Sequence, residues 1–107
     1  MYKIVTHHDI LLGKSFDLPC FDKDLTDIQL LSDFSDVVNN AIYETFIILA
    51  DHPEWDAVPC FLTDNVVFDI KRESFVGQFD PCLEFYEANE DFEVCSHLQR
   101  LKTIIEK

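Results

Sequence analysis

The sequence predicts an α+β fold in which two main helices pack on a small, mainly antiparallel β-sheet. Three observations predict it: an apolar pattern of helical period over residues 35–51, a second one over 92–105, and two β-branched and aromatic runs on either side of a turn at 63–65. A chain of 107 residues that is 48% hydrophobic is sufficient for one core, so we expect a single domain spanning residues 1–107.

The N-terminal third carries the weakest signals. Residues 1–6 alternate briefly and predict a strand, and the polar residues 7–9 predict a turn. Residues 14–24 contain Pro19 and several aspartates, which predicts irregular structure. Apolar spacing within 25–31 predicts a helix of about two turns.

The central helix is expected to begin after Ser35, a good N-cap that is followed by an acid in the first turn. It is expected to end near Asp51, because the residue before Pro53 is disfavoured in a helix. Residues 58–62 and 66–70 are predicted to form the two strands of a hairpin.

The segment between this hairpin and the C-terminal helix is ambiguous. Residues 75–79 are predicted to add a short strand. Asp80 and Pro81 resemble a cap followed by proline in a first helical turn, which predicts a helix over 82–88, with a strand as the alternative. Residues 92–105 have acids at their start and cations near their end, as the helix dipole prefers.

Charge is the most informative feature of the sequence. Lys and Arg number 8 against 21 Asp and Glu, which gives a formal net charge of −13. Residues 24–70 contain ten acids and no Lys or Arg, and residues 73–99 contain seven more, again without either cation. Such unopposed charge costs stability through self-repulsion, but it speeds association with a strongly basic partner and orients it.

The same charge excludes other classes of partner. Free nucleic acid and anionic membranes need clustered cations, so we expect no direct binding to either. The N-terminus lacks the apolar run of a secretory signal, and no apolar stretch approaches the roughly 20 residues that a bilayer requires. We therefore expect a cytoplasmic protein, and a monomer.

No motif indicates catalysis, a metal or a cofactor. His52, Glu54 and Cys60 superficially follow the zinc deaminase pattern, but Thr63 stands where its second cysteine is required. The four cysteines form no Cys-x-x-Cys pair, and in a reducing compartment we expect buried thiols. Folding can still bring cysteines and histidines together, but the sequence predicts no enzyme, no metal site and no cofactor.

Aromatic residues interleave with the acids, and an interface uses exposed aromatics within a charged rim as anchors. We therefore predict a partner-binding surface made of one tryptophan and two clusters of acids. Its residues are Asp24, Asp27, Asp33, Asp36, Trp55, Glu84, Glu87, Glu90, Asp91 and Glu93.

In size, acidity and lack of catalytic motifs the chain is similar to the immunity proteins that bacteria make against their own nuclease toxins. That similarity implies an inhibitor that covers the active or nucleic-acid-binding surface of a basic protein partner. Two alternatives stay open. One is a nucleic-acid mimic that blocks a DNA-binding protein, and the other is a small enzyme or adaptor subunit whose acidity is incidental.

Overall fold

A computed structural model describes residues 2–21, 33–63 and 66–106. Four strands form one sheet in the order β1-β2-β3-β4: β1 (Tyr2–Asp9), β2 (Lys14–Phe21), β3 (Ala57–Thr63) and β4 (Val66–Lys71). The helical elements are α2 (Ser35–Asp51), the short 3-10 helix η1 (Arg72–Ser74), α3 (Phe75–Ala88) and α4 (Phe92–Ile105). The pairs β1–β2 and β3–β4 are antiparallel and β2–β3 is parallel, so the mainly antiparallel α+β fold is confirmed.

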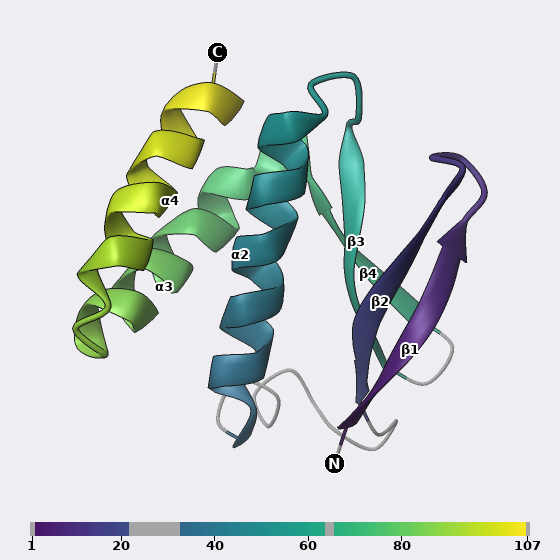
Figure 1. The fold of residues 1–107 in the computed structure, drawn as a ribbon, viewed down its shortest axis with the longest axis horizontal. Coiled ribbons are helices and arrows are strands. Elements are labelled where there is room, and N and C mark those ends of the chain that lie inside the picture. The colour runs from purple at the N-terminus through teal and green to yellow at the C-terminus, as the bar shows by residue number, and fades with distance from the viewer. Residues whose placement is uncertain (1, 22–32, 64–65, 107) are drawn as a thin grey trace.

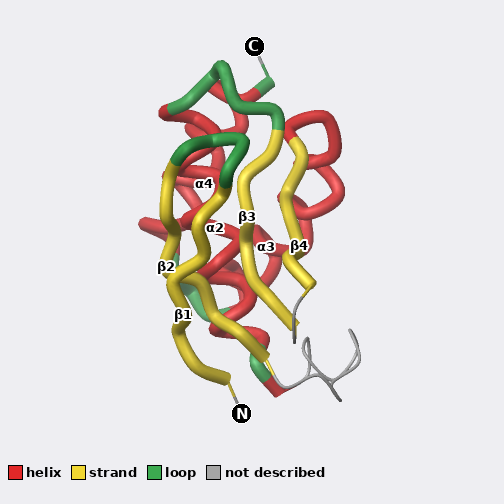
Figure 2. The backbone as a smooth tube through the Cα atoms, turned by 90° about the vertical axis from the view of Figure 1, so that its right-hand side faces the viewer, coloured by secondary structure: helices red, strands yellow, loops and turns green. Residues whose placement is uncertain are grey.

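The α-helices of the described ranges, α2, α3 and α4, lie on one side of the sheet (Figure 1). Helix α2 runs between the sheet and α4, and the view onto the strands shows them in front of the helices (Figure 2). The strand order places β1 and β4 at the two edges.

Each of these α-helices contributes at least one large apolar side chain to the core. Phe46 and Leu49 of α2, Phe79 of α3 and Leu98 of α4 are at most 1% exposed. The ring of Phe46 contacts those of Phe75 and Phe79, at centroid distances of 5.9 and 6.1 Å. These ring contacts hold α2 and α3 to one another.

The N-terminal hairpin corrects two predictions. Residues 7–9, predicted as a turn, continue β1, and residues 14–21, predicted as irregular, form β2. β2 pairs with β3 only at Cys20 and Phe21. Pro19 is tolerated in β2 because no backbone hydrogen bond to β3 is needed at its position, so its missing N–H costs none. The turn lies at residues 10–13 instead, where Gly13 has a φ of 66° that favours glycine.

Helix α3 corrects a third prediction. Residues 75–79 are its first turns and not a strand, and Pro81 lies inside it and not in a first turn. Phe75, Phe79, Cys82 and Tyr86 recur at steps of four and three and are all buried. Burial of that face against α2 and α4 outweighs the missing proline N–H.

The other predicted elements are confirmed within a residue or two. Helix α2 ends at Asp51 as predicted, but its N-cap is Phe34, so Ser35 is its first residue and its side chain does not cap. The hairpin of β3 and β4 and the C-terminal helix α4 form where the sequence predicts them. The short helix predicted over 25–31 lies outside the described residues.

Arg72 closes the C-terminal end of α2. Its guanidinium donates to the backbone carbonyls of Leu49 at 2.7 Å, His52 at 2.8 Å and Trp55 at 3.0 Å. Its backbone N–H donates to the carbonyl of Asp56 at 2.7 Å. A cation at this position also suits the negative end of the helix dipole, so Arg72 ties α2 to the start of β3.

Candidate protein-binding surface

Most of the described carboxylates face solvent, and none of them pairs with a Lys or Arg of the described residues. Every described Asp and Glu except Asp9 is exposed. Within the described ranges no carboxylate forms an ion pair with Lys or Arg, and the one ion pair joins Glu54 to the Nδ1 of His52 at 3.2 Å. The negative field is therefore not neutralised within this part of the chain and is available to a partner.

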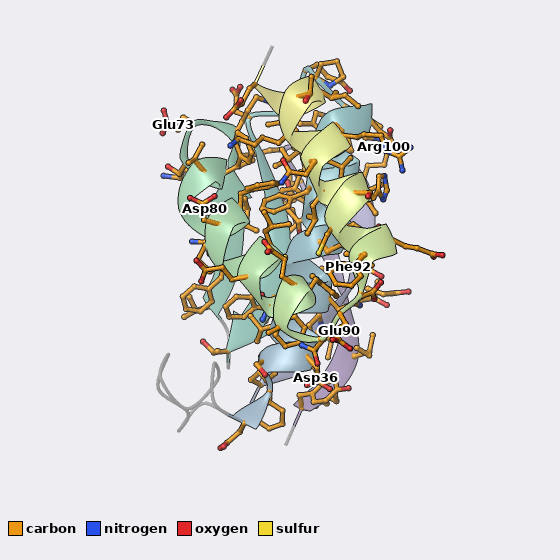
Figure 3. The ribbon with its side chains drawn as sticks, turned by 90° about the vertical axis from the view of Figure 1, so that its left-hand side faces the viewer. Asp36, Glu73, Asp80, Glu90, Phe92 and Arg100 are labelled. Atoms are coloured by element: carbon orange, nitrogen blue, oxygen red, sulfur yellow. The ribbon has the colours of Figure 1, made fainter. Side chains whose placement is uncertain are left out.

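The predicted acids converge in part. Asp33 lies just before α2 and Asp36 in its first turn, while Asp24 and Asp27 lie outside the described residues. Helix α2 begins at the end of the molecule where α3 passes into α4 (Figure 1), and Asp36 and Glu90 lie at that same end (Figure 3).

The second cluster surrounds the connection between α3 and α4. Glu84 and Glu87 lie on α3, Glu90 in the connection, Asp91 at the N-cap of α4 and Glu93 in its first turn. We define the acidic corner as residues Glu87, Glu90, Asp91, Phe92 and Glu93.

Backbone hydrogen bonds hold the acidic corner in a fixed shape. The Asp91 N–H donates to the Tyr86 carbonyl and the Glu90 N–H to the Glu87 carbonyl, both at 3.0 Å, which is the Schellman pattern of a helix C-terminus. The Asp91 carboxylate accepts from the Val94 N–H at 3.4 Å and so caps α4. Part of the acidity of the corner is thus structural.

Glu90 occupies a position that favours glycine. Its φ is 58°, and among the described residues it is the one non-glycine residue with a positive φ. It follows the C-cap of α3, at a position where glycine is usual. A side chain with a Cβ costs about 1 kcal/mol in this conformation. Strain of this kind is typical of functional positions, and here it places a carboxylate at the apex of the corner.

We predict that Glu90→Gly raises the stability of the protein and weakens partner binding. The free energy of unfolding should rise by about 0.5–1 kcal/mol, because glycine removes the strain at a positive φ. Urea unfolding of the variant measures this change. A loss of stability in this variant would show that the Glu90 side chain stabilises the fold, and it would contradict the strain assigned to this position.

Phe92 is the aromatic residue of the corner, and it opens the apolar pattern over residues 92–105. Its side chain is 64% exposed at the first position of α4, between Asp91 and Glu93 (Figure 3). Its position directly after a run of acids was the sequence signal that it begins the helix and does not reach the core.

An open depression lies beside Phe92. Its lining includes Tyr43, whose hydroxyl is hydrogen-bonded to the Nδ1 of His97, together with Ser96 and Arg100. Burial, and next the nearby Asp91 carboxylate, raise the pKa of Tyr43 above its usual value. His97 is half-buried through this contact with α2, which its sequence position alone did not indicate.

Trp55 does not join the acids. It is half-buried beyond the C-terminal end of α2, opposite the end that carries Asp36. Its ring stacks on His52 with centroids 3.9 Å apart and meets the edge of Phe16 at 6.3 Å. The structure therefore gives Trp55 a packing role at the other end of the molecule from the acidic corner.

Two of the four cysteines, Cys60 and Cys82, are buried as expected, whereas Cys20 and Cys95 are only partly buried. Cys60 is 1% and Cys82 0% exposed, and burial raises the pKa of each to about 12. Among the described residues, no three His, Cys, Asp or Glu side chains are grouped as metal ligands.

We predict that Cys60 and Cys82 resist alkylation in the folded protein. A thiol with so high a pKa holds almost no thiolate at neutral pH, and burial blocks the reagent as well. Iodoacetamide should label them about 10³-fold more slowly than in the urea-unfolded chain, measured by peptide mass spectrometry. Equal rates in both states would contradict their burial.

Comparison with protein-family models, with curated proteins and with solved structures gave no match. In the described part of the chain, no helix has the length and apolar character needed to cross a bilayer.

Proposed function

We propose that this protein binds a basic protein and neutralises it, as an immunity-type inhibitor does with a nuclease toxin. One observation carries the proposal: within the described residues, every carboxylate but that of Asp9 is exposed, and none forms an ion pair with Lys or Arg. A net charge of −13 that is left unpaired raises the rate of encounter with a cationic surface and orients it.

The acidic corner is the part of this surface best suited to direct contact. Interfaces place an aromatic anchor within a polar rim, and Phe92 lies 64% exposed between acids. The Schellman turn keeps these side chains in place before binding, which reduces the entropy that binding costs.

The proposal includes the compartment and the oligomeric state. A nuclease inhibitor of this kind acts in the cytoplasm, where nucleic acid is exposed to the toxin. Like charges oppose self-association, so the inhibitor is a monomer until it meets its partner.

Two alternatives make different predictions. A nucleic-acid mimic would compete with DNA for a binding protein that does not cleave it. An adaptor would use the apolar surface of Phe92, and its complex would be insensitive to salt.

The test is an activity measurement on a purified basic partner. If that partner cleaves nucleic acid, an equimolar amount of this protein should abolish cleavage, and about 0.5 M salt should weaken the complex. An unchanged cleavage rate with the complex formed would overturn the inhibitor function. Lost DNA binding by a partner without nuclease activity would favour the mimic.

A further inference from the structure

We infer that the free edge of β1 and the groove between β1 and α2 bind an extended basic segment of a partner protein as an added β-strand. The inference shares with the proposed function only the basic character of the partner. It concerns a different surface from the acidic corner. That surface is formed by β1 and β2 of the sheet and by the side of α2 that carries Asp36 and Glu44.

The edge of β1 is open and regular. All eight residues of β1 pair with β2 without a register shift, and in the described ranges no strand pairs with its other side. β1 contains no proline and no bulge, and its one Lys or Arg is Lys3. Natural proteins usually block such an edge, because its alternate N–H and C=O groups are ready to pair with another chain. The other edge strand, β4, is shorter, and its pairing with β3 is irregular.

Helix α2 leaves the side of β1 that faces it partly uncovered. Ile4 is 60% and Tyr2 41% exposed, and the Tyr2 ring is held in place by Phe21 and Phe34 at 5.6 and 5.8 Å. A groove of about 400 Å³ runs between these side chains and α2. Pro19 of β2 and Val37 and Ala41 of α2 also line it.

The charge of the groove selects its occupant. Asp17 of β2 and Asp36 and Glu44 of α2 line it, and its lining contains no Lys, Arg or His. One oxygen of Asp17 accepts from the Thr6 hydroxyl at 2.8 Å, but none of the three carboxylates has a cationic partner in the described chain. Burial of an uncharged or acidic segment here would leave these carboxylates desolvated and unpaired.

The geometry of an added strand determines the sequence that it needs. Side chains of a strand alternate between its two faces, about 6.6–6.8 Å apart on one face. A segment with Lys or Arg at every second position would place all its cations over the groove. A second copy of this chain would instead bring the same three carboxylates together, so the charge pattern favours a basic partner.

A synthetic ten-residue peptide that alternates lysine and valine, with both ends blocked, tests the inference. Added to the intact protein at low salt, it should slow the hydrogen exchange of alternate β1 amides and shift the NMR signals of Tyr2 and Ile4. A peptide with the same sequence and N-methylated alternate amides should lose most of this binding, because it cannot pair with the edge.

Paired variants test the charge of the groove. Asp36→Asn with Glu44→Lys should weaken peptide binding about tenfold. Asp51→Asn with Glu106→Lys makes the same change in net charge at exposed positions outside the groove and should weaken it far less. No binding at millimolar peptide, equal binding of the N-methylated peptide, or equal effects of the two variants would each overturn the inference. None of these results depends on the acidic corner, so the proposed function stands or falls separately.

Discussion

Arg72→Met is expected to lower the free energy of unfolding by about 3 kcal/mol. The guanidinium donates to three backbone carbonyls at 2.7–3.0 Å, and a hydrogen bond from a charged donor contributes about 1.5–3 kcal/mol, with losses that do not simply add. Methionine preserves most of the volume but leaves the carbonyls of Leu49, His52 and Trp55 without this donor. Urea unfolding followed by circular dichroism measures the change.

Two companion variants separate geometry from charge. Lys71→Met removes one positive charge from the neighbouring exposed residue and should change stability by less than about 0.5 kcal/mol. Arg72→Lys keeps the charge but not the planar fork, and it should recover only part of the loss. If Lys71→Met and Arg72→Met destabilised the protein equally, the effect would be one of net charge, and the role assigned to Arg72 would be wrong.

Reversal of charge at the acidic corner is expected to slow association with a basic partner about 10- to 100-fold at low salt. The variant carries Glu87→Lys, Glu90→Lys and Glu93→Lys, three exposed positions whose side chains cap neither α3 nor α4. Steering acts on the encounter, so the association rate constant should fall more than the dissociation rate constant rises. Stopped-flow or surface-plasmon measurements on a purified partner give both constants.

The matched control carries Asp51→Lys, Glu73→Lys and Glu106→Lys. It also raises the net charge from −13 to −7, by two for each of three residues, but at exposed positions outside the corner. Its association rate should fall less, and the difference should shrink as salt screens the charges. If both variants slowed association equally, the net charge of the protein would set the association rate, and the acidic corner would have no special role.

The fold was predictable where a single periodic signal dominates. Helix α2 and the β3–β4 hairpin follow from such patterns. β2 was missed because Pro19 resembles a breaker, and only the sheet topology shows that the strand lacks a β3 partner there. The spacing of Phe75, Phe79 and Cys82 did contain the helical signal of α3, but Pro81 and the β-propensity of nearby residues obscured it.

The candidate site was less predictable than the fold. Acidity alone predicted Glu87, Glu90 and Glu93 as candidate residues, but it did not show that Phe92 is exposed or that Trp55 packs at the far end of α2. The strained backbone of Glu90 belongs to the turn that ends α3, and no glycine marks that position in the sequence. The unpaired side of β1 in the described ranges depends on the strand order, which has no local signature.

The most direct test of the central claim is a three-way capture from a lysate of the cells that encode the chain. The beads carry the wild-type protein, the corner-reversed variant or the matched control, and quantitative mass spectrometry identifies what binds. We predict a basic protein that is enriched on the wild type and on the control, released by about 0.5 M salt, and depleted on the corner-reversed variant. A captured set that is the same on all three proteins, or a partner that is acidic and unaffected by salt, would contradict binding of a basic protein through the acidic corner.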